Sequence, residues 1–190
     1  AVKGARHGAE AVAGEGLLDG ALQRVAATWG LPLVLQEWVA GVEYDVAVLG
    51  GRDGRVLGAV PMKKLQIDAQ GKAWGGITVA SDDLDRLVAT VMSELRWPGI
   101  CEIELVRRES DGSLHVIEIN PRAPSWIPLA VVAGQNLPHA LLRLILGEDV
   151  EPFRGYTVGA MTVRTVLDLV SPLGVYESLV VGGSSRGPAA

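Results

Sequence analysis

Hydrophobic residues in the middle of the chain gather in short runs of β-branched and aliphatic side chains, a pattern that is typical of strands. Turn-forming residues separate these runs, among them Ala40-Gly41 and the turn at Arg52-Asp53-Gly54. The pattern therefore predicts a strand-rich block, with strands expected at residues 33–38, 43–50, 55–67, 74–80, 100–108 and 114–120.

A different period marks the helices, because their apolar residues recur every three or four positions. The clearest case is residues 81–95, where Leu84, Val88 and Met92 form an apolar stripe and Ser81 stands at the N-cap position. Further helices are predicted at residues 17–29, 126–133, 138–146 and 172–179, and one more strand at 156–170. The order of these elements predicts an α+β fold.

The composition limits what such a fold can do. Of 190 residues, 48% are hydrophobic and 21% are charged, so the chain can bury a sizeable core and is neither disordered nor fibrous. A net charge of −5 argues against a general nucleic-acid binder. No run approaches the roughly twenty apolar residues of a membrane span, and Cys101 has no second cysteine to pair with, so we expect a cytoplasmic protein without membrane contact.

The turn at Ser110-Asp111-Gly112 predicts a β-hairpin whose two arms carry acidic residues. Because side chains alternate along a strand, Glu102 and Glu104 share one face of the first arm, and Glu118 and Asn120 share one face of the second. A three-residue or five-residue loop centred on Asp111 puts Glu104 directly opposite Glu118, with Cβ atoms about 5 Å apart. Two facing carboxylates repel, so either one has a raised pKa or a cation lies between them.

The oxygen atoms of Glu104, Glu118 and Asn120 form a hard ligand set of the kind that Mg²⁺ prefers. A solvated hairpin face is the alternative interpretation of such a pair of acids. The neighbouring Pro121-Arg122 favours the metal site, because a cation beside two acids and a metal ion is what phosphoryl chemistry uses.

The segment Glu118-Ile119-Asn120-Pro121-Arg122 resembles the ATP-grasp superfamily, in particular its carbamoyl phosphate synthetase large-chain type. The resemblance runs from Lys3 to about Gly147. It implies that Glu104, Glu118 and Asn120 hold Mg²⁺ or Mn²⁺ ions on the phosphates of ATP, with Glu102 a further candidate. It also implies that Arg122 stabilises the phosphoryl group during transfer.

Nucleotide recognition is expected at the segment Gln36-Glu37-Trp38-Val39, which, with Gly41 and Glu43, resembles the hinge between the two lobes of this superfamily. There the backbone around Glu37 and Val39 would bind the adenine edge, and Glu43 would bind the ribose hydroxyls. A strand that leaves its sheet exposes amide and carbonyl groups that match a purine edge. The alternative is an edge strand with solvated polar residues.

Four lysines are candidates for contact with phosphate. Lys3 matches the lysine that ends a strand of the small lobe in the superfamily, and Lys72 lies near a phosphate-contacting position of the carbamoyl phosphate synthetase type. Lys63 and Lys64 are neighbours on one predicted strand, so they point to opposite faces and at most one enters the site. We expect Lys63 or Lys72 to contact phosphate; the alternative is a surface role.

The resemblance implies a small lobe (1–38), a large lobe with the metal site (39–150) and a C-terminal strand and helix extension (151–190), with ATP between the lobes. The implied activity is that of an ATP-dependent ligase, which joins a small carboxylate or peptide substrate to an amine or similar nucleophile through an acyl-phosphate. Family members usually begin with a further N-terminal domain. We therefore expect this chain to need that domain or another protomer as a partner, and not to turn over alone.

Two other interpretations remain open. The chain could be a nucleotide-binding or regulatory ATP-grasp module that keeps its MgATP contacts without ligase turnover. It could also be a non-catalytic interaction domain whose acidic hairpin is fortuitous. The sequence leaves the carboxylate and the nucleophile unidentified.

Overall fold

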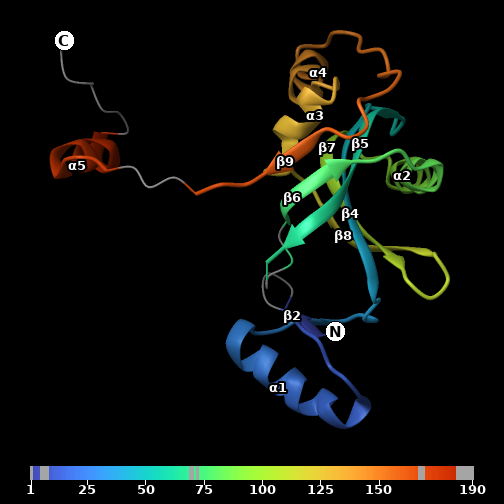
Figure 1. The fold of residues 1–190 in the computed structure, drawn as a ribbon, viewed down its shortest axis with the longest axis vertical. Helices are drawn as coiled ribbons and strands as arrows, with labels where there is room; N and C mark the ends of the chain where they lie inside the picture. Colours follow the sequence, from blue (N-terminus) through green and yellow to red (C-terminus); the bar gives the residue numbers. More distant parts are fainter. Residues whose placement is uncertain (1, 5–8, 69–70, 72, 167–169, 183–190) are drawn as a thin grey trace.

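The computed structural model describes the chain apart from residues 1, 5–8, 69–70, 72, 167–169 and 183–190. Two antiparallel sheets organise the described residues into a small lobe and a large lobe, which are stacked one above the other in Figure 1. The predicted α+β fold is confirmed.

The small lobe consists of a three-stranded sheet in the order β2-β1-β3 and one long helix. Its elements are β1 (Val2–Gly4), β2 (Ala9–Glu10), the 3₁₀ helix η1 (Glu15–Leu17), α1 (Leu18–Trp29) and β3 (Leu33–Leu35). Ala21 and Val25 of α1 form the centre of a small apolar core. The predicted strand at 33–38 ends earlier than expected, since residues 36–40 belong to neither sheet.

The large lobe is built on a six-stranded antiparallel sheet in the order β8-β7-β4-β5-β6-β9. Its strands are β4 (Gly41–Gly50), β5 (Val56–Ile67), β6 (Ala73–Thr78), β7 (Gly99–Arg108), β8 (Leu114–Asn120) and β9 (Met161–Val163). Of the strand expected at 156–170, the described residues form only β9, which pairs with β6 at the edge of the sheet; residues 167–169 lie outside the described part of the chain.

Helices cover both faces of this sheet (Figure 1). Helix α2 (Asp82–Leu95) buries the predicted stripe of Leu84, Val88 and Met92 against one face. Helices α3 (Ile127–Val132) and α4 (Leu137–Ile145) form a second core on the opposite face. A last helix, α5 (Leu173–Gly182), follows β9. Among the described residues, no helix combines the length and the apolar character needed to cross a bilayer.

Alternation along the strands decides which residues remain for chemistry. On β4, Val46 and Val48 point into the α2 core, whereas Ala47 and Leu49 point into the α3–α4 core. Polar residues on the α3–α4 face therefore lie at the end of β4 that directly follows residues 36–40. That end of the sheet is the one that faces the small lobe in Figure 1.

Candidate functional site

Acidic side chains from three neighbouring strands form a row across the α3–α4 face of the large sheet. Asp45 of β4 is paired with Glu104 of β7, and Glu104 is paired with Glu118 of β8. In the next row, Glu102 of β7 is paired with Asn120 of β8. The predicted opposition of Glu104 and Glu118 is confirmed by this register.

Two departures from the predicted hairpin cancel each other. The turn has four residues instead of the expected three or five, because the Arg108 amide donates to the Ser113 carbonyl at 2.8 Å and encloses residues 109–112. Pairing next to the turn is therefore shifted by one residue, with Leu105 opposite Val116. A β-bulge at Ile117 then restores the register at the acids.

Glu102 is the most enclosed acid of the hairpin, with 5% of its surface exposed. The Trp126 indole donates to its Oε1 at 2.7 Å, and the Arg122 guanidinium donates to its Oε2 at 3.1 Å. Burial raises the pKa of Glu102, and the negative charge of Glu104 raises it further, while Trp126 and Arg122 lower it. Glu102 therefore holds Arg122 and the start of α3 against the acidic row.

Glu104 lies at the centre of the row and has contacts on both sides. The Asn120 amide donates to its Oε1 at 2.9 Å, and the Lys64 ammonium donates to its Oε2 at 3.2 Å. The Asn120 amide also reaches Oε2 of Glu102 at 3.3 Å. Asn120 and Glu104 are thus brought together as predicted from the sequence, and Glu118 lies beside them as an exposed residue.

Lys64 is the main cation of the site, although only 3% of its side chain is exposed. Its ammonium lies 3.1 Å from both Glu43 and Asp45, in addition to Glu104, and 3.2 Å from the Gly71 carbonyl. Burial by itself would lower the pKa of Lys64, but the three carboxylates outweigh burial and raise it, so the side chain stays charged.

Lys63 does not lie where we expected it. It stands opposite Tyr44, whose ring packs on the α2 core, so its side chain belongs to the other face of the sheet. The expectation that Lys63 enters the site is therefore wrong, and Lys64 occupies that place. Lys72 lies outside the described residues, and of Lys3 the structure describes only the backbone, which pairs with Val34.

Asp45 was not among the residues predicted from the sequence. It is 3% exposed, and burial raises its pKa to about 7, with Lys64 acting against the shift and Glu104 and Glu102 adding to it. A signal for it exists, because an acid inside an aliphatic strand and two residues after Glu43 must share the face of Glu43. A buried carboxylate without a role is expensive, so its position points to function.

Arg122 follows directly after β8 and reaches back over the acids. Its guanidinium binds Glu102, and 57% of the side chain remains exposed. Glu102 therefore fixes the Arg122 guanidinium on one side, and its other side is accessible to a ligand.

Residues 36–40, which we call the interlobe segment, connect β3 to β4. The Gln36 side chain donates to the Ile117 carbonyl at 3.1 Å, and Glu37 accepts from Arg108 at 2.7 Å. Trp38 is exposed and Val39 is half-buried. The segment is therefore fastened to the hairpin β7–β8, and Glu43, three residues after its end, reaches the site through Lys64.

A metal ion is implied by the chemistry of these ligands, and the arrangement fits one. Asp45, Glu102 and Glu104 each offer a carboxylate oxygen within 4.8 Å of the others, and we call these three residues the acidic cluster. Oδ1 of Asp45 has no hydrogen bond among the described residues, although the Lys64 ammonium is near it. A set of oxygen ligands with a buried carboxylate oxygen that makes no regular hydrogen bond suits Mg²⁺ or Mn²⁺.

A hollow of about 250 Å³ adjoins the acidic cluster on the side of Trp126. The indole of Trp126 forms part of its wall while donating to Glu102. Trp74 of β6 also lines it, and the Arg164 guanidinium donates to the Ser125 hydroxyl there. The hollow thus combines aromatic walls with a cation and hydroxyl groups.

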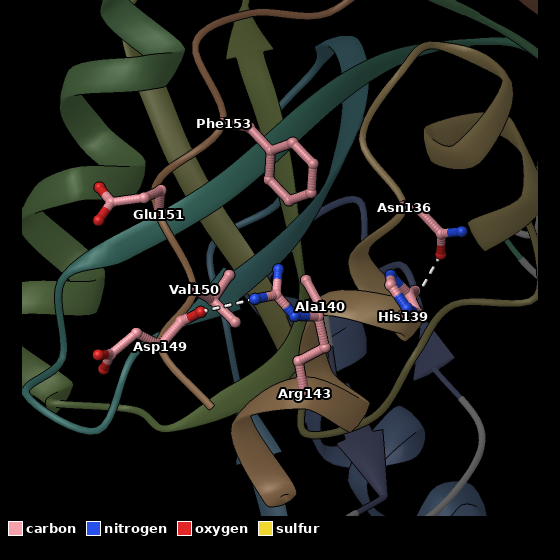
Figure 2. A pocket seen from close by; sticks show the side chains of 8 residues that line it. All are labelled: Asn136, His139, Ala140, Arg143, Asp149, Val150, Glu151 and Phe153. Carbon is pink, nitrogen blue, oxygen red and sulfur yellow. Dashed lines mark hydrogen bonds between the residues drawn. The ribbon is translucent and has the colours of Figure 1, made fainter. Parts of the chain in front are cut away.

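A second hollow of similar volume lies along α4 and is drawn in Figure 2. Its polar groups mostly bind one another: Arg143 donates to the Asp149 carbonyl and to Glu148, and Asn136 accepts from the His139 amide. None of the predicted site residues lines it.

Comparison with known proteins identifies the arrangement. A family model described as "ATP-grasp in the biosynthetic pathway with Ter operon" matches residues 31–166. The chain belongs to the ATP-grasp family. The ATP-grasp match spans the interlobe segment, the acidic cluster, Lys64 and Arg122.

Individual relatives agree with this assignment. The ATP-grasp chain is 25% identical over 169 residues to the carbamoyl phosphate synthase large chain of Agathobacter rectalis, a match covering 83% of this chain and 15% of that protein. Its fold is similar to biotin carboxylase from Campylobacter jejuni (TM-score 0.68, 14% identity, 84% of this chain and 40% of that one). It is also similar to an L-amino acid ligase from Bacillus licheniformis (TM-score 0.59, 19% identity, 80% and 41%). The chain therefore spans well under half the length of these relatives.

Proposed function

We propose that this chain is the ATP-binding and phosphoryl-transfer part of an ATP-dependent ligase that activates a carboxylate as an acyl-phosphate. The observation that carries the proposal is the acidic cluster, which combines three converging carboxylates with the cations of Lys64 and Arg122. Phosphoryl transfer needs positioned charge rather than a protein nucleophile, and this arrangement supplies charge of both signs.

The nucleotide would bind between the interlobe segment and the acidic cluster. The backbone of Glu37 and Val39 would meet the adenine edge, with Gln36 and Trp38 beside it, and Glu43 would accept from the ribose hydroxyls. The interlobe segment supports this role because it leaves both sheets, and because Glu43 keeps 36% of its side chain exposed while it binds Lys64. Lys3 and Lys72 stay candidates for phosphate contacts.

Asp45, Glu102 and Glu104 would hold Mg²⁺, with Glu118 and Asn120 adjacent as further ligands. The metal ion, when bound, neutralises phosphate charge. Arg122 would stabilise the negative charge on the transferring group, since its guanidinium is fixed at one end by Glu102. Lys64 would take the phosphate-contacting role that we first gave to Lys63.

In the proposed reaction, an oxygen of the substrate carboxylate bonds to the γ-phosphorus, the bond to the bridging oxygen breaks, and ADP leaves. An amine or similar nucleophile then attacks the acyl carbon and phosphate departs. The chain's part is to align the reactants and to keep water away from the activated carboxylate. The hollow beside Trp126 would hold that carboxylate, with Arg164 as its cation.

The test is a calorimetric titration of the chain with ATP, with and without Mg²⁺, followed by an ADP-release assay over a panel of carboxylates and amines. We expect Mg²⁺-dependent ATP binding, and ADP release that requires a carboxylate when the partner domain is present. Arg164→Ala should reduce carboxylate-dependent release, while Arg55→Gln, a change at an exposed turn, should not.

The outcomes separate the three interpretations. MgATP binding without carboxylate-dependent ADP release would contradict ligase activity and support a nucleotide-binding or regulatory module. Failure to bind MgATP would leave a non-catalytic interaction domain.

A further inference from the structure

Lys64 occupies the position in which a bound cation would be expected. Its ammonium makes three ion pairs, at 3.1 to 3.2 Å, with Glu43, Asp45 and Glu104. Only 3% of its side chain is exposed, so the carboxylates, and not water, stabilise the charged ammonium. A compact ammonium on a flexible stem is the side chain best able to act as an internal cation and then to move.

The partners of Lys64 overlap with the acidic cluster. Two of the three carboxylates that converge there, Asp45 and Glu104, are also partners of Lys64. Asp45 is almost wholly buried, and its Oδ1 meets the Lys64 ammonium at 3.1 Å without the alignment of a regular hydrogen bond, so this ligand atom of the cluster depends on the charge of Lys64. Lys64 therefore neutralises two carboxylates of the cluster, Asp45 and Glu104.

A divalent metal ion and the Lys64 ammonium cannot both have these carboxylates without strong repulsion. Like charges a few ångströms apart in a poorly solvated site interact far more strongly than in water. The ammonium must therefore find other negative partners when a metal ion enters. Phosphate oxygens are such partners.

We propose that Lys64 is an internal counter-ion that holds the acidic cluster in the nucleotide-free protein, so that a divalent metal ion binds poorly alone and well together with a polyphosphate. The role of polyphosphate rests on the proposed function. The competition between Lys64 and the metal ion rests on the ion pairs alone. This arrangement makes metal and nucleotide bind in concert and prevents the empty site from retaining metal.

The test measures Mn²⁺ binding to the nucleotide-free chain by electron paramagnetic resonance, with Mn²⁺ as the probe. Lys64→Met should bind Mn²⁺ at least tenfold more tightly than the unchanged chain, because the competing charge is gone. Lys64→Arg keeps the charge and should bind as weakly as the unchanged chain. The matched control is Lys63→Met, one residue away on the other face of the sheet, which should have no effect.

Thermal unfolding supplies the second measurement, because removing Lys64 leaves three acids without their cation. In EDTA, Lys64→Met should melt at a lower temperature than Lys63→Met, and Mn²⁺ should restore it while NaCl of equal ionic strength should not. If Lys64→Met folds only with Mn²⁺, the proposal is supported. Equal Mn²⁺ affinity in all variants, or a variant that Mn²⁺ cannot rescue, would overturn it.

A final titration separates this proposal from the proposed function. With ATP present, the unchanged chain should bind Mn²⁺ at least tenfold more tightly than without it. If Lys64→Met gains Mn²⁺ affinity but ATP has no effect on the unchanged chain, the counter-ion role holds and the nucleotide site fails. If ATP promotes Mn²⁺ binding but Lys64→Met gains no Mn²⁺ affinity without ATP, the nucleotide site is supported and the counter-ion role of Lys64 fails.

Discussion

The indole N–H of Trp126 donates to Oε1 of Glu102 at 2.7 Å, and both residues are almost fully buried. This bond joins the start of α3 to the centre of the acidic hairpin. Asn120 and Arg122 also donate to this carboxylate. Trp126, which packs in the core of the large lobe, therefore also positions a carboxylate of the candidate metal site.

We predict that Trp126→Phe lowers the free energy of unfolding by about 1 to 3 kcal/mol, because a buried carboxylate oxygen loses its donor. Burial already raises the pKa of Glu102 and Trp126 opposes that shift, so the variant should raise the pKa further. A raised carboxyl pKa costs stability as the pH rises above the unfolded value of about 4. Urea unfolding should therefore show a larger loss at pH 8 than at pH 5; an equal loss at both would contradict the assignment.

Glu104→Gln and Glu118→Gln should each weaken Mg²⁺-dependent ATP binding at least tenfold, because each removes a charged oxygen from the row that crosses the sheet. The fold should survive in both variants. Without Mg²⁺, the melting temperature of Glu118→Gln should be unchanged or higher, since like charge is removed, whereas Glu104→Gln loses its ion pair with Lys64 and should melt no higher than the unchanged chain. Glu94→Gln, an exposed change on α2, is the control. Unchanged MgATP titrations in both site variants would reject the metal assignment.

Glu43→Ala should weaken ATP binding by about 1 to 3 kcal/mol through loss of the ribose contact. Glu37→Gln should have only a mild effect, because recognition by the interlobe segment is mainly through backbone. The decisive comparison is with 2′,3′-dideoxy-ATP, which should bind the unchanged chain as weakly as ATP binds Glu43→Ala. Equal affinity of the unchanged chain for both nucleotides would argue against the role of Glu43.

The ion pair between Asp83 of α2 and Arg107 of β7, with N–O distances of 2.5 and 3.0 Å, should stabilise the fold at neutral pH. Hydrogen bonds from Arg107 and Ser81 lower the pKa of Asp83, so its contribution is present above the unfolded pKa of about 4 and is lost as the pH falls towards the lower folded value. Asp83→Asn should cost about 0.5 to 1 kcal/mol at pH 7 and low salt. Asp82→Asn, in the same helical turn, is the control. A cost that does not shrink between pH 4 and pH 2 would exclude the ion pair as its source.

Cys101 should be inert to thiol reagents in the folded protein. It is 1% exposed within the α2 core, and burial raises its pKa to about 11, so both access and thiolate formation are suppressed. Its labelling by iodoacetamide at pH 8 should follow global unfolding across a urea series. Rapid labelling without denaturant would show that β7 opens locally.

The sequence by itself determined the features that depend on neighbours along the chain. Alternation and a turn sufficed to place Glu104 against Glu118, although the turn and the bulge at Ile117 each shift the pairing by one residue and compensate. The apolar stripe of α2 was likewise predicted, because a helix presents one face every three or four residues.

Only the tertiary structure decided which residues complete the site. Asp45 meets Glu104 through pairing of β4 with β7, strands far apart in the chain, and no local pattern encodes that register. Alternation established that Lys63 and Lys64 point to opposite faces, but the choice between them depends on which face α2 covers. The packing of the whole sheet determines which charged side chains meet. For this reason Lys64 and its partner Asp45 could not be assigned to the site from the sequence alone.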